Sequence, residues 1–307
     1  MFTSHLPVAG LDVFYPGLVL LGLATGMLTG LFGIGGGFII TPALRIIFGI
    51  PYPLAVGASL LQIVAATTLS TCSHWRRRNV DLKLGAIMAA GSLVGAEGGV
   101  RLLRVLDGLG SVTVAGQPRL WLDLILGGCY FVLLASVAAF MLRECLSART
   151  AEPETCLAGR LRQWSAPPLQ VFEYSGIGPI SLWVPVGISL AVGLLAGLLG
   201  IGGGFVGLPL MIYLIGLPTR LAVGTSTVQV LAASSYGALR YAQGGSVDFL
   251  LAGWLILGAL AGVKAGMRLS ACTDCRTTRL WFAGLLALAA LLVAAHLLAG
   301  DSLIYRK

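Results

Sequence analysis

Charged side chains are scarce in this sequence. Asp, Glu, Lys and Arg make up 10% of the 307 residues, whereas soluble domains contain about 25%. The motifs GxxxxGK[ST], HExxH and GxSxG are absent, which argues against an ATP-driven pump, a zinc peptidase and a serine hydrolase. We therefore predict neither an enzyme nor a cofactor or metal site. The net charge of +8 comes from basic residues in short loops, which membrane topology explains better than nucleic-acid binding.

Apolar segments are abundant, and 57% of the residues are hydrophobic. Eight runs approach the length of about 20 residues that a bilayer core requires, and two shorter runs follow clusters of glycine. The long runs cover residues 14–32, 54–74, 84–106, 120–142, 182–199, 221–241, 249–267 and 280–298, and the short runs cover 38–48 and 205–215. The pattern predicts an all-α, multi-pass protein of the bacterial inner membrane, inserted by its first helix without a cleaved signal peptide.

The sequence contains an internal repeat. Residues 26–102 align without a gap with residues 193–269, so each position matches one 167 residues later. The pairs include GIGGGF with GIGGGF, Pro42 with Pro209, and LAVGASLLQ with LAVGTSTVQ. We predict an N-terminal membrane repeat over 14–143, an extramembrane connector over 144–180 and a C-terminal membrane repeat over 181–300. Such repeats are typical of secondary transporters, whose substrate site lies at the repeat interface near the midplane.

The relative orientation of the repeats depends on the short segments. Each repeat supplies five segments in the order long, short, long, long, long. If the short segment spans the bilayer, the repeats lie inverted; if it dips in and returns, they lie parallel. With residues 76–78 in the cytoplasm, the inverted arrangement places more Lys and Arg inside and is favoured, while the parallel arrangement stays open.

The glycine clusters predict broken helices at the midplane. Three successive glycines disfavour a helix and allow both left-handed backbone angles and close approach of a ligand. The N–H groups at the start of the next helix would then face the break and hold an anion. The predicted binding glycines are Gly35, Gly36, Gly37, Gly202, Gly203 and Gly204. The alternative is simple helix packing, which is our expectation for the series at 91, 95 and 99 and at 258, 262 and 266.

Polar residues in the repeated block after each break are further candidates. Ser59 and Gln62, like Ser226 and Gln229, lie three residues apart on one helix face, and Thr225 adds a hydroxyl. Such neutral groups can donate to an oxyanion. The alternative is hydrogen bonding between helices, which contributes about 0.6 kcal/mol in membranes.

Two ionisable residues in apolar sequence occupy equivalent repeat positions. Glu97 and Lys264 are 167 residues apart. Buried charges in membranes are costly and usually functional, so we predict an ion pair or gate. The alternative is that both lie near helix ends and reach water.

The doubled pattern GIGGGF…P…G(I/L)P…AVG(A/T)S…Q resembles the TauE/SafE sulfite exporter family, also called the 4-toluene sulfonate uptake permease family, over residues 14–300. The resemblance implies an inner-membrane carrier of sulfite, thiosulfate or organosulfonates, with import and export both represented. We therefore predict a secondary transporter that alternates access between its repeats, with protons as a candidate coupling ion. The alternatives are a passive anion channel, a transporter of other small organic anions, and a membrane thiol enzyme that uses Cys272 and Cys275 of CTDC.

Overall fold

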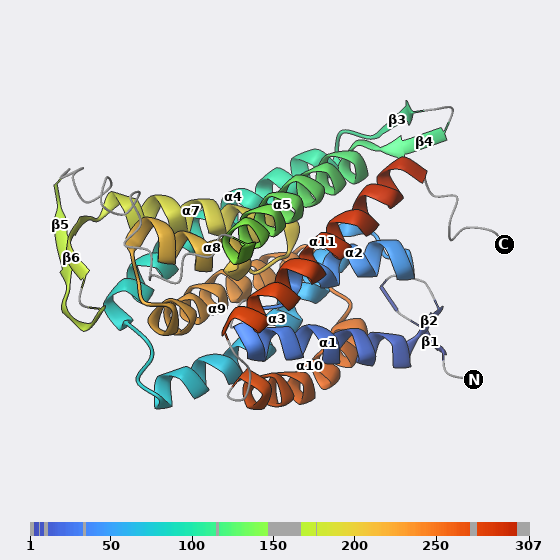
Figure 1. Cartoon of the computed structure of the whole chain (residues 1–307). Coiled ribbons are helices and arrows are strands. Elements are labelled where there is room, and N and C mark those ends of the chain that lie inside the picture. The colour runs from blue at the N-terminus through green and yellow to red at the C-terminus, as the bar shows by residue number, and fades with distance from the viewer. Residues whose placement is uncertain are drawn as a thin grey trace.

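The computed structural model describes residues 3–5, 7–8, 12–32, 35–114, 117–146, 167–175, 177–270 and 275–299. Helices dominate these parts of the chain (Figure 1). The first half contains α1 (Tyr15–Phe32), α2 (Gly37–Phe48), α3 (Tyr52–Arg76), α4 (Leu82–Asp107) and α5 (Trp121–Leu146). The second half contains α7 (Trp183–Leu199), α8 (Gly204–Leu210), the π-helical turn η2 (Met211–Ile215), α9 (Thr219–Gln243), α10 (Phe249–Ser270) and α11 (Cys275–Ala299).

Among the described helices, five are long and apolar enough to cross a membrane: α1, α3, α4, α5 and α10. The sequence predicted eight long segments. Of the other three, α7 has only 17 residues, α9 contains the polar run Thr225-Ser226-Thr227 together with Gln229, and the described apolar part of α11 covers only Ala283–Ala295. The main elements of the chain are therefore those of an all-α membrane protein. Its helix α9 is long enough to cross a membrane but is more polar than the five candidate spans.

Three β-hairpins accompany the helices, and the sequence analysis did not predict them. β1 (Thr3–His5) pairs with β2 (Asp12–Phe14), β3 (Ser111–Val114) with β4 (Gln117–Leu120), and β5 (Leu169–Phe172) with β6 (Ile177–Ser181). The β5–β6 hairpin occupies the end of the predicted connector. A 3-10 turn between its strands (Glu173–Ser175) places the Ser175 hydroxyl on the buried Asp81 carboxylate, which caps the N-terminus of α4.

Helices from opposite halves pack closely through glycine. A Cβ atom added at Gly26 of α1 would lie 2.3 Å from the carbonyl oxygen of Ala259 in α10, and one added at Gly95 of α4 would lie 2.1 Å from that of Leu190 in α7. Only a residue without a side chain permits such approach. The packing role predicted for the series at 91, 95 and 99 and at 258, 262 and 266 is confirmed, since all six glycines abut a helix of the other half.

The central helices α3 and α9 run antiparallel. A Cβ at Gly57, near the start of α3, would lie 2.2 Å from the carbonyl oxygen of Ser246, just after α9. In turn, a Cβ at Gly224, near the start of α9, would lie 1.8 Å from the carbonyl oxygen of Asn79, just after α3. The two contacts join positions that the sequence repeat makes equivalent. The starts of α2, α3 and α4 likewise precede those of α8, α9 and α10 by 167 residues.

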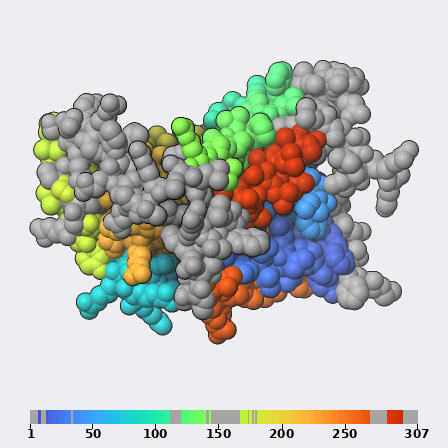
Figure 2. All heavy atoms as spheres, in the orientation of Figure 1, coloured from blue at the N-terminus to red at the C-terminus, as the bar shows by residue number. Residues whose placement is uncertain are grey.

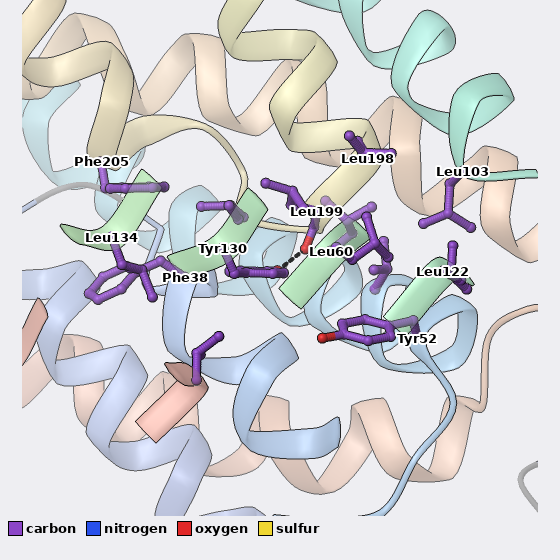
Figure 3. Close-up of a cluster of buried hydrophobic side chains, with 14 of the residues drawn as sticks. Phe38, Tyr52, Leu60, Leu103, Leu122, Tyr130, Leu134, Leu198, Leu199 and Phe205 are labelled. Atoms are coloured by element: carbon purple, nitrogen blue, oxygen red, sulfur yellow. Dashed lines mark hydrogen bonds between the residues drawn. The ribbon is translucent and has the colours of Figure 1, made fainter. Parts of the chain in front are cut away.

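The largest buried cluster joins α2, α3, α4, α5, α7, α8, α9 and α11. Phe38 and Phe205, which follow the two glycine clusters, have ring centroids 5.5 Å apart. Figure 3 shows both near Tyr130, whose hydroxyl points at Leu199. On the surface, α5 and α11 lie side by side (Figure 2) and expose Val132, Leu291 and other large apolar residues. Such an apolar exterior suits contact with lipid.

Candidate functional site

Both glycine clusters interrupt a helix, as predicted. α1 ends at Phe32 and α2 begins at Gly37, with φ angles of 82° at Gly35 and 64° at Gly36. α7 ends at Leu199 and α8 begins at Gly204, with φ angles of 72° at Gly202 and 75° at Gly203. These left-handed angles cost other L-residues about 1–2 kcal/mol each. The glycines therefore serve a backbone conformation here.

The two breaks meet at one point of the molecule. A Cβ at Gly35 would lie 3.1 Å from Val230 and 3.2 Å from Ile63, and one at Gly202 would lie 3.1 Å from Ile63 and 3.2 Å from Val230. Ile63 of α3 and Val230 of α9 occupy equivalent repeat positions, 167 residues apart. A Cβ at Gly37 would lie 2.8 Å from the carbonyl oxygen of Gly200, so the breaks also approach each other. The structure thus brings Gly35, Gly37 and Gly202 together, whereas Cβ atoms at Gly36 and Gly203 would meet Thr25 and Val192 of the helices that precede the two breaks.

Side-chain hydroxyls satisfy the backbone where the second break begins. Tyr241 donates to the carbonyl of Gly197 over 2.8 Å, Tyr130 donates to that of Leu199, and Ser59 donates to that of Gly200 over 3.0 Å. Carbonyl groups at a helix end lack partners within the helix, and hydrocarbon offers none. The three hydroxyls therefore stabilise the non-helical backbone of this break.

Ser59 and the two other predicted hydroxyls already have partners. Besides its hydrogen bond to the Gly200 carbonyl, the Ser59 hydroxyl forms a hydrogen bond with the Thr41 hydroxyl over 2.9 Å. Ser226 donates to the carbonyl of Val223 over 2.8 Å. Thr225 accepts from the backbone N–H of Asp81 over 3.1 Å, which places it at the start of α4 rather than at the breaks. These three contacts support the backbone.

The two glutamines differ from these hydroxyls. Gln62 and Gln229 precede Ile63 and Val230, and their residues are 0% and 1% exposed. Within the described part of the chain, both polar atoms of Gln62 and the Nε2 of Gln229 have no hydrogen-bond partner. A Cβ at Gly207, in α8, would lie 3.5 Å from the Oε1 of Gln229, so this amide faces the helix that follows the second break. A buried amide without a partner costs about 1–3 kcal/mol, so these two side chains are the clearest candidates for binding a ligand.

Glu97 has partners other than the predicted one. Its carboxylate accepts from Arg240 Nε over 2.9 Å and from Arg240 Nη2 over 3.1 Å, and also from Arg101 Nε over 2.6 Å and Tyr236 over 3.1 Å. Lys264 is exposed on α10. The predicted pair between Glu97 and Lys264 is therefore corrected.

The packing of the helices explains this correction. α4 lies against α7 and α9, whereas α10 lies against α1 and α3, so equivalent positions on α4 and α10 face different neighbours. Repeat symmetry could not have indicated Arg240, because its equivalent residue is Ser73.

A second ion pair involves the helix after the first break. Arg45 of α2 lies 2.6 Å from the Asp123 carboxylate of α5, and its guanidinium lies 5.7 Å from the ring centroid of Tyr52. The position equivalent to Arg45 is Ile212. This pair could not be predicted from the sequence, since nothing in it relates residues 45 and 123.

Other predicted features lie outside what the structure describes. Cys272 falls in residues 271–274, and the side chain of Cys275, at the start of α11, also lies outside the described parts of the structure. Among the described residues, no three His, Cys, Asp or Glu side chains gather into a possible metal site.

Comparison with known proteins identifies the family. The chain matches the family described as Sulfite exporter TauE/SafE over residues 18–293. The chain belongs to this family. It is 28% identical to the probable membrane transporter proteins YjnA and YunE of Bacillus subtilis (strain 168); the alignments cover 82% and 81% of this chain and 89% and 86% of those proteins. It is 27% identical to a probable membrane transporter protein of Xylella fastidiosa (strain 9a5c), over 80% of each. No solved structure matches it.

Membership in the TauE/SafE family and these relatives make the chain a multi-pass membrane transporter of a small molecule. The apolar helices described above agree with this. A membrane transporter needs a substrate site enclosed by its helices, and helices broken at glycine can line such a site.

Proposed function

We propose that this protein is a secondary transporter of a small sulfur-containing anion, such as sulfite, thiosulfate or an organosulfonate, in the bacterial inner membrane. One observation carries the proposal: the two glycine breaks meet at Ile63 and Val230, beside two buried glutamines whose Nε2 groups have no hydrogen-bond partner among the described residues. Substrate sites at the interface of broken helices are a recurring feature of such carriers.

The chemistry of this point suits an oxyanion. The Nε2 groups of Gln62 and Gln229 are hydrogen-bond donors, and the first N–H groups of α2, which starts at Gly37, lack partners within the helix and carry its positive dipole end. The residues that meet here are uncharged. A neutral site holds an anion through hydrogen bonds without a permanent opposite charge, so the anion can leave again.

The two repeats are proposed to lie inverted in the membrane. The contacts of Gly57 with Ser246 and of Gly224 with Asn79 make α3 and α9 antiparallel neighbours. Because α3 and α9 are equivalent in the repeat, an axis that exchanges them runs across the helices and hence along the membrane plane. Alternating access then rocks one repeat against the other around the shared site. The basic residues 76–78 mark the cytoplasmic side.

The Glu97–Arg240 ion pair is proposed as a gate in place of the predicted pair with Lys264. It joins α4 to α9 through two hydrogen bonds between one guanidinium and one carboxylate. The equivalent positions on α10 and α3 hold Lys264 and Ser73, which cannot form such a pair. The ion pair therefore connects α4 to α9, whereas no equivalent pair connects α10 to α3. Opening of the transporter on the side of the ion pair requires Glu97 and Arg240 to separate.

The test is uptake of labelled sulfite and thiosulfate into proteoliposomes that contain the purified protein, with and without a pH gradient. A proton-coupled carrier gives saturable uptake that depends on the gradient, whereas a channel gives flux that does not saturate. If neither anion enters, labelled organosulfonates and carboxylates test the broader class of organic anions. Replacing both Cys272 and Cys275 with Ser should leave uptake unchanged; loss of activity would favour the thiol enzyme.

A further inference from the structure

One face of α3 carries polar groups away from the glycine breaks. Thr67, Ser70 and His74 follow Ile63 by four, seven and eleven residues, spacings that return to the same side of a helix with 3.6 residues per turn. Thr71 lies beside them. We call these four residues the α3 polar stripe. It begins where both breaks contact Ile63 and ends next to Arg76.

Most of the stripe lacks hydrogen-bond partners. Within the described residues, the Ser70 and Thr71 hydroxyls and the Nδ1 of His74 are buried without one, and Ser70 is 0% exposed. Thr67 donates to the backbone of Ile63 over 2.6 Å. Three such groups within two turns of one membrane helix are costly unless something binds them.

The equivalent face of α9 is closed. The positions that correspond to Ser70, Thr71 and His74 hold Gly237, Ala238 and Tyr241. A Cβ at Gly237 would lie 2.9 Å from Leu60, Ala238 is 5% exposed, and the Tyr241 hydroxyl is bound to the carbonyl of Gly197. The Glu97–Arg240 pair lies beside Tyr241 on the same helix end. The two halves of the molecule therefore differ: this face of α9 is filled by packing, whereas the equivalent face of α3 carries buried polar groups without hydrogen-bond partners.

We propose that the α3 polar stripe is a second oxyanion-binding site, on the route between the glycine breaks and the end of α3. The hydroxyls of Ser70 and Thr71 and the ring of His74 hold a dehydrated sulfur oxyanion or sulfonate by hydrogen bonds, and the exposed Arg76, Arg77 and Arg78 attract it from water. Ser70 and His74 lie about 10 Å and about 16 Å from Ile63 along the helix at 1.5 Å per residue, which is far enough for a site distinct from the one at the breaks. This inference rests on the proposed anion transport.

The test uses single cysteines in a variant whose native cysteines are replaced by serine. Thr71→Cys and its repeat equivalent Ala238→Cys form a matched pair. Both are labelled in detergent solution, where the two ends of the protein are equally accessible, with two methanethiosulfonates, one carrying a sulfonate and one a quaternary ammonium. Thr71→Cys is expected to react faster than Ala238→Cys, and faster with the sulfonate probe than with the cationic probe. An unlabelled organosulfonate such as methanesulfonate, which does not react with the probes, should slow the reaction by occupying the stripe.

Equal rates at the two positions, or a preference for the cationic probe, would overturn the inference. Uptake gives a second measurement. His74→Leu and Ser70→Ala each remove a hydrogen bond to a charged ligand, which is expected to lower uptake at subsaturating anion about tenfold. Wild-type uptake in both variants, together with an unreactive Thr71→Cys, would refute the second site while leaving the proposed transport function standing. No uptake by the wild-type protein would instead refute the proposed function.

Discussion

Replacing the left-handed glycine of the second break tests whether its backbone conformation is required. In Gly203→Ala, the φ angle of 75° costs about 1–2 kcal/mol for an L-residue. The new Cβ would also lie 2.4 Å from Val192 Cγ1 and 2.8 Å from the Val192 carbonyl oxygen, an overlap of the kind that costs about 1–3 kcal/mol. Together these terms predict a loss of roughly 2–5 kcal/mol, a large part of the ~5–15 kcal/mol by which folded proteins are stable.

The assay is thermal unfolding in detergent, paired with anion uptake in proteoliposomes. Gly187→Ala is the matched control, because Gly187 lies within α7 and a Cβ there would meet no atom within 4 Å. That change should raise helix stability by about 0.5–1 kcal/mol, so the two glycine-to-alanine substitutions are predicted to shift the melting temperature in opposite directions. Gly36→Ala should behave like Gly203→Ala. A Gly203→Ala protein with wild-type melting and uptake would refute the claim that the break requires glycine.

Three further predictions follow from individual contacts. Glu97→Gln and Arg240→Gln should each lower the free energy of unfolding by about 1 kcal/mol, and the double variant should lose little more than either single one; fully additive losses in chemical or thermal unfolding would argue against a direct pair. Ser59→Ala should lower the melting temperature, because it leaves a carbonyl of the second break without its donor, at a cost of about 1–3 kcal/mol, while the anion affinity of the folded protein stays near wild type. Gly95→Ala should separate α4 from α7 and lower stability by about 1–3 kcal/mol, whereas Gly98→Ala, whose Cβ would meet its nearest atom at 4.0 Å, should not; equal melting temperatures would contradict this.

The main elements could be predicted because their signals are local. Apolar runs located the helices to within a few residues, as for the run over 54–74 and α3 (Tyr52–Arg76). The two glycine clusters located both breaks, since no other residue tolerates consecutive left-handed angles at so small a cost. The hairpins were missed because β5 and β6 together hold only nine residues inside a segment whose composition is typical of a loop.

The partners of the site residues could not be predicted, since they depend on which helices become neighbours. The repeat gave the positions of Gln62 and Gln229 but did not distinguish them from Ser59, which the fold uses to bind the Gly200 carbonyl. It also suggested Lys264 for Glu97, although the pairing of α4 with α9 brings Arg240 there instead. Symmetry in a sequence locates equivalent positions, while contacts between helices decide which of them meet.

The central claim is that both halves build one anion site where the breaks meet. The most direct measurement is calorimetric titration of the purified protein with thiosulfate, for the wild type, Gln62→Ala, Gln229→Ala and the double variant, in a Ser70→Ala and His74→Leu background that removes binding at the stripe. We predict one anion per chain and an affinity that falls about tenfold when either amide is removed, as for a hydrogen bond to a charged ligand. Two anions per chain with each single change abolishing only one of them, or unchanged affinity in both variants, would contradict it.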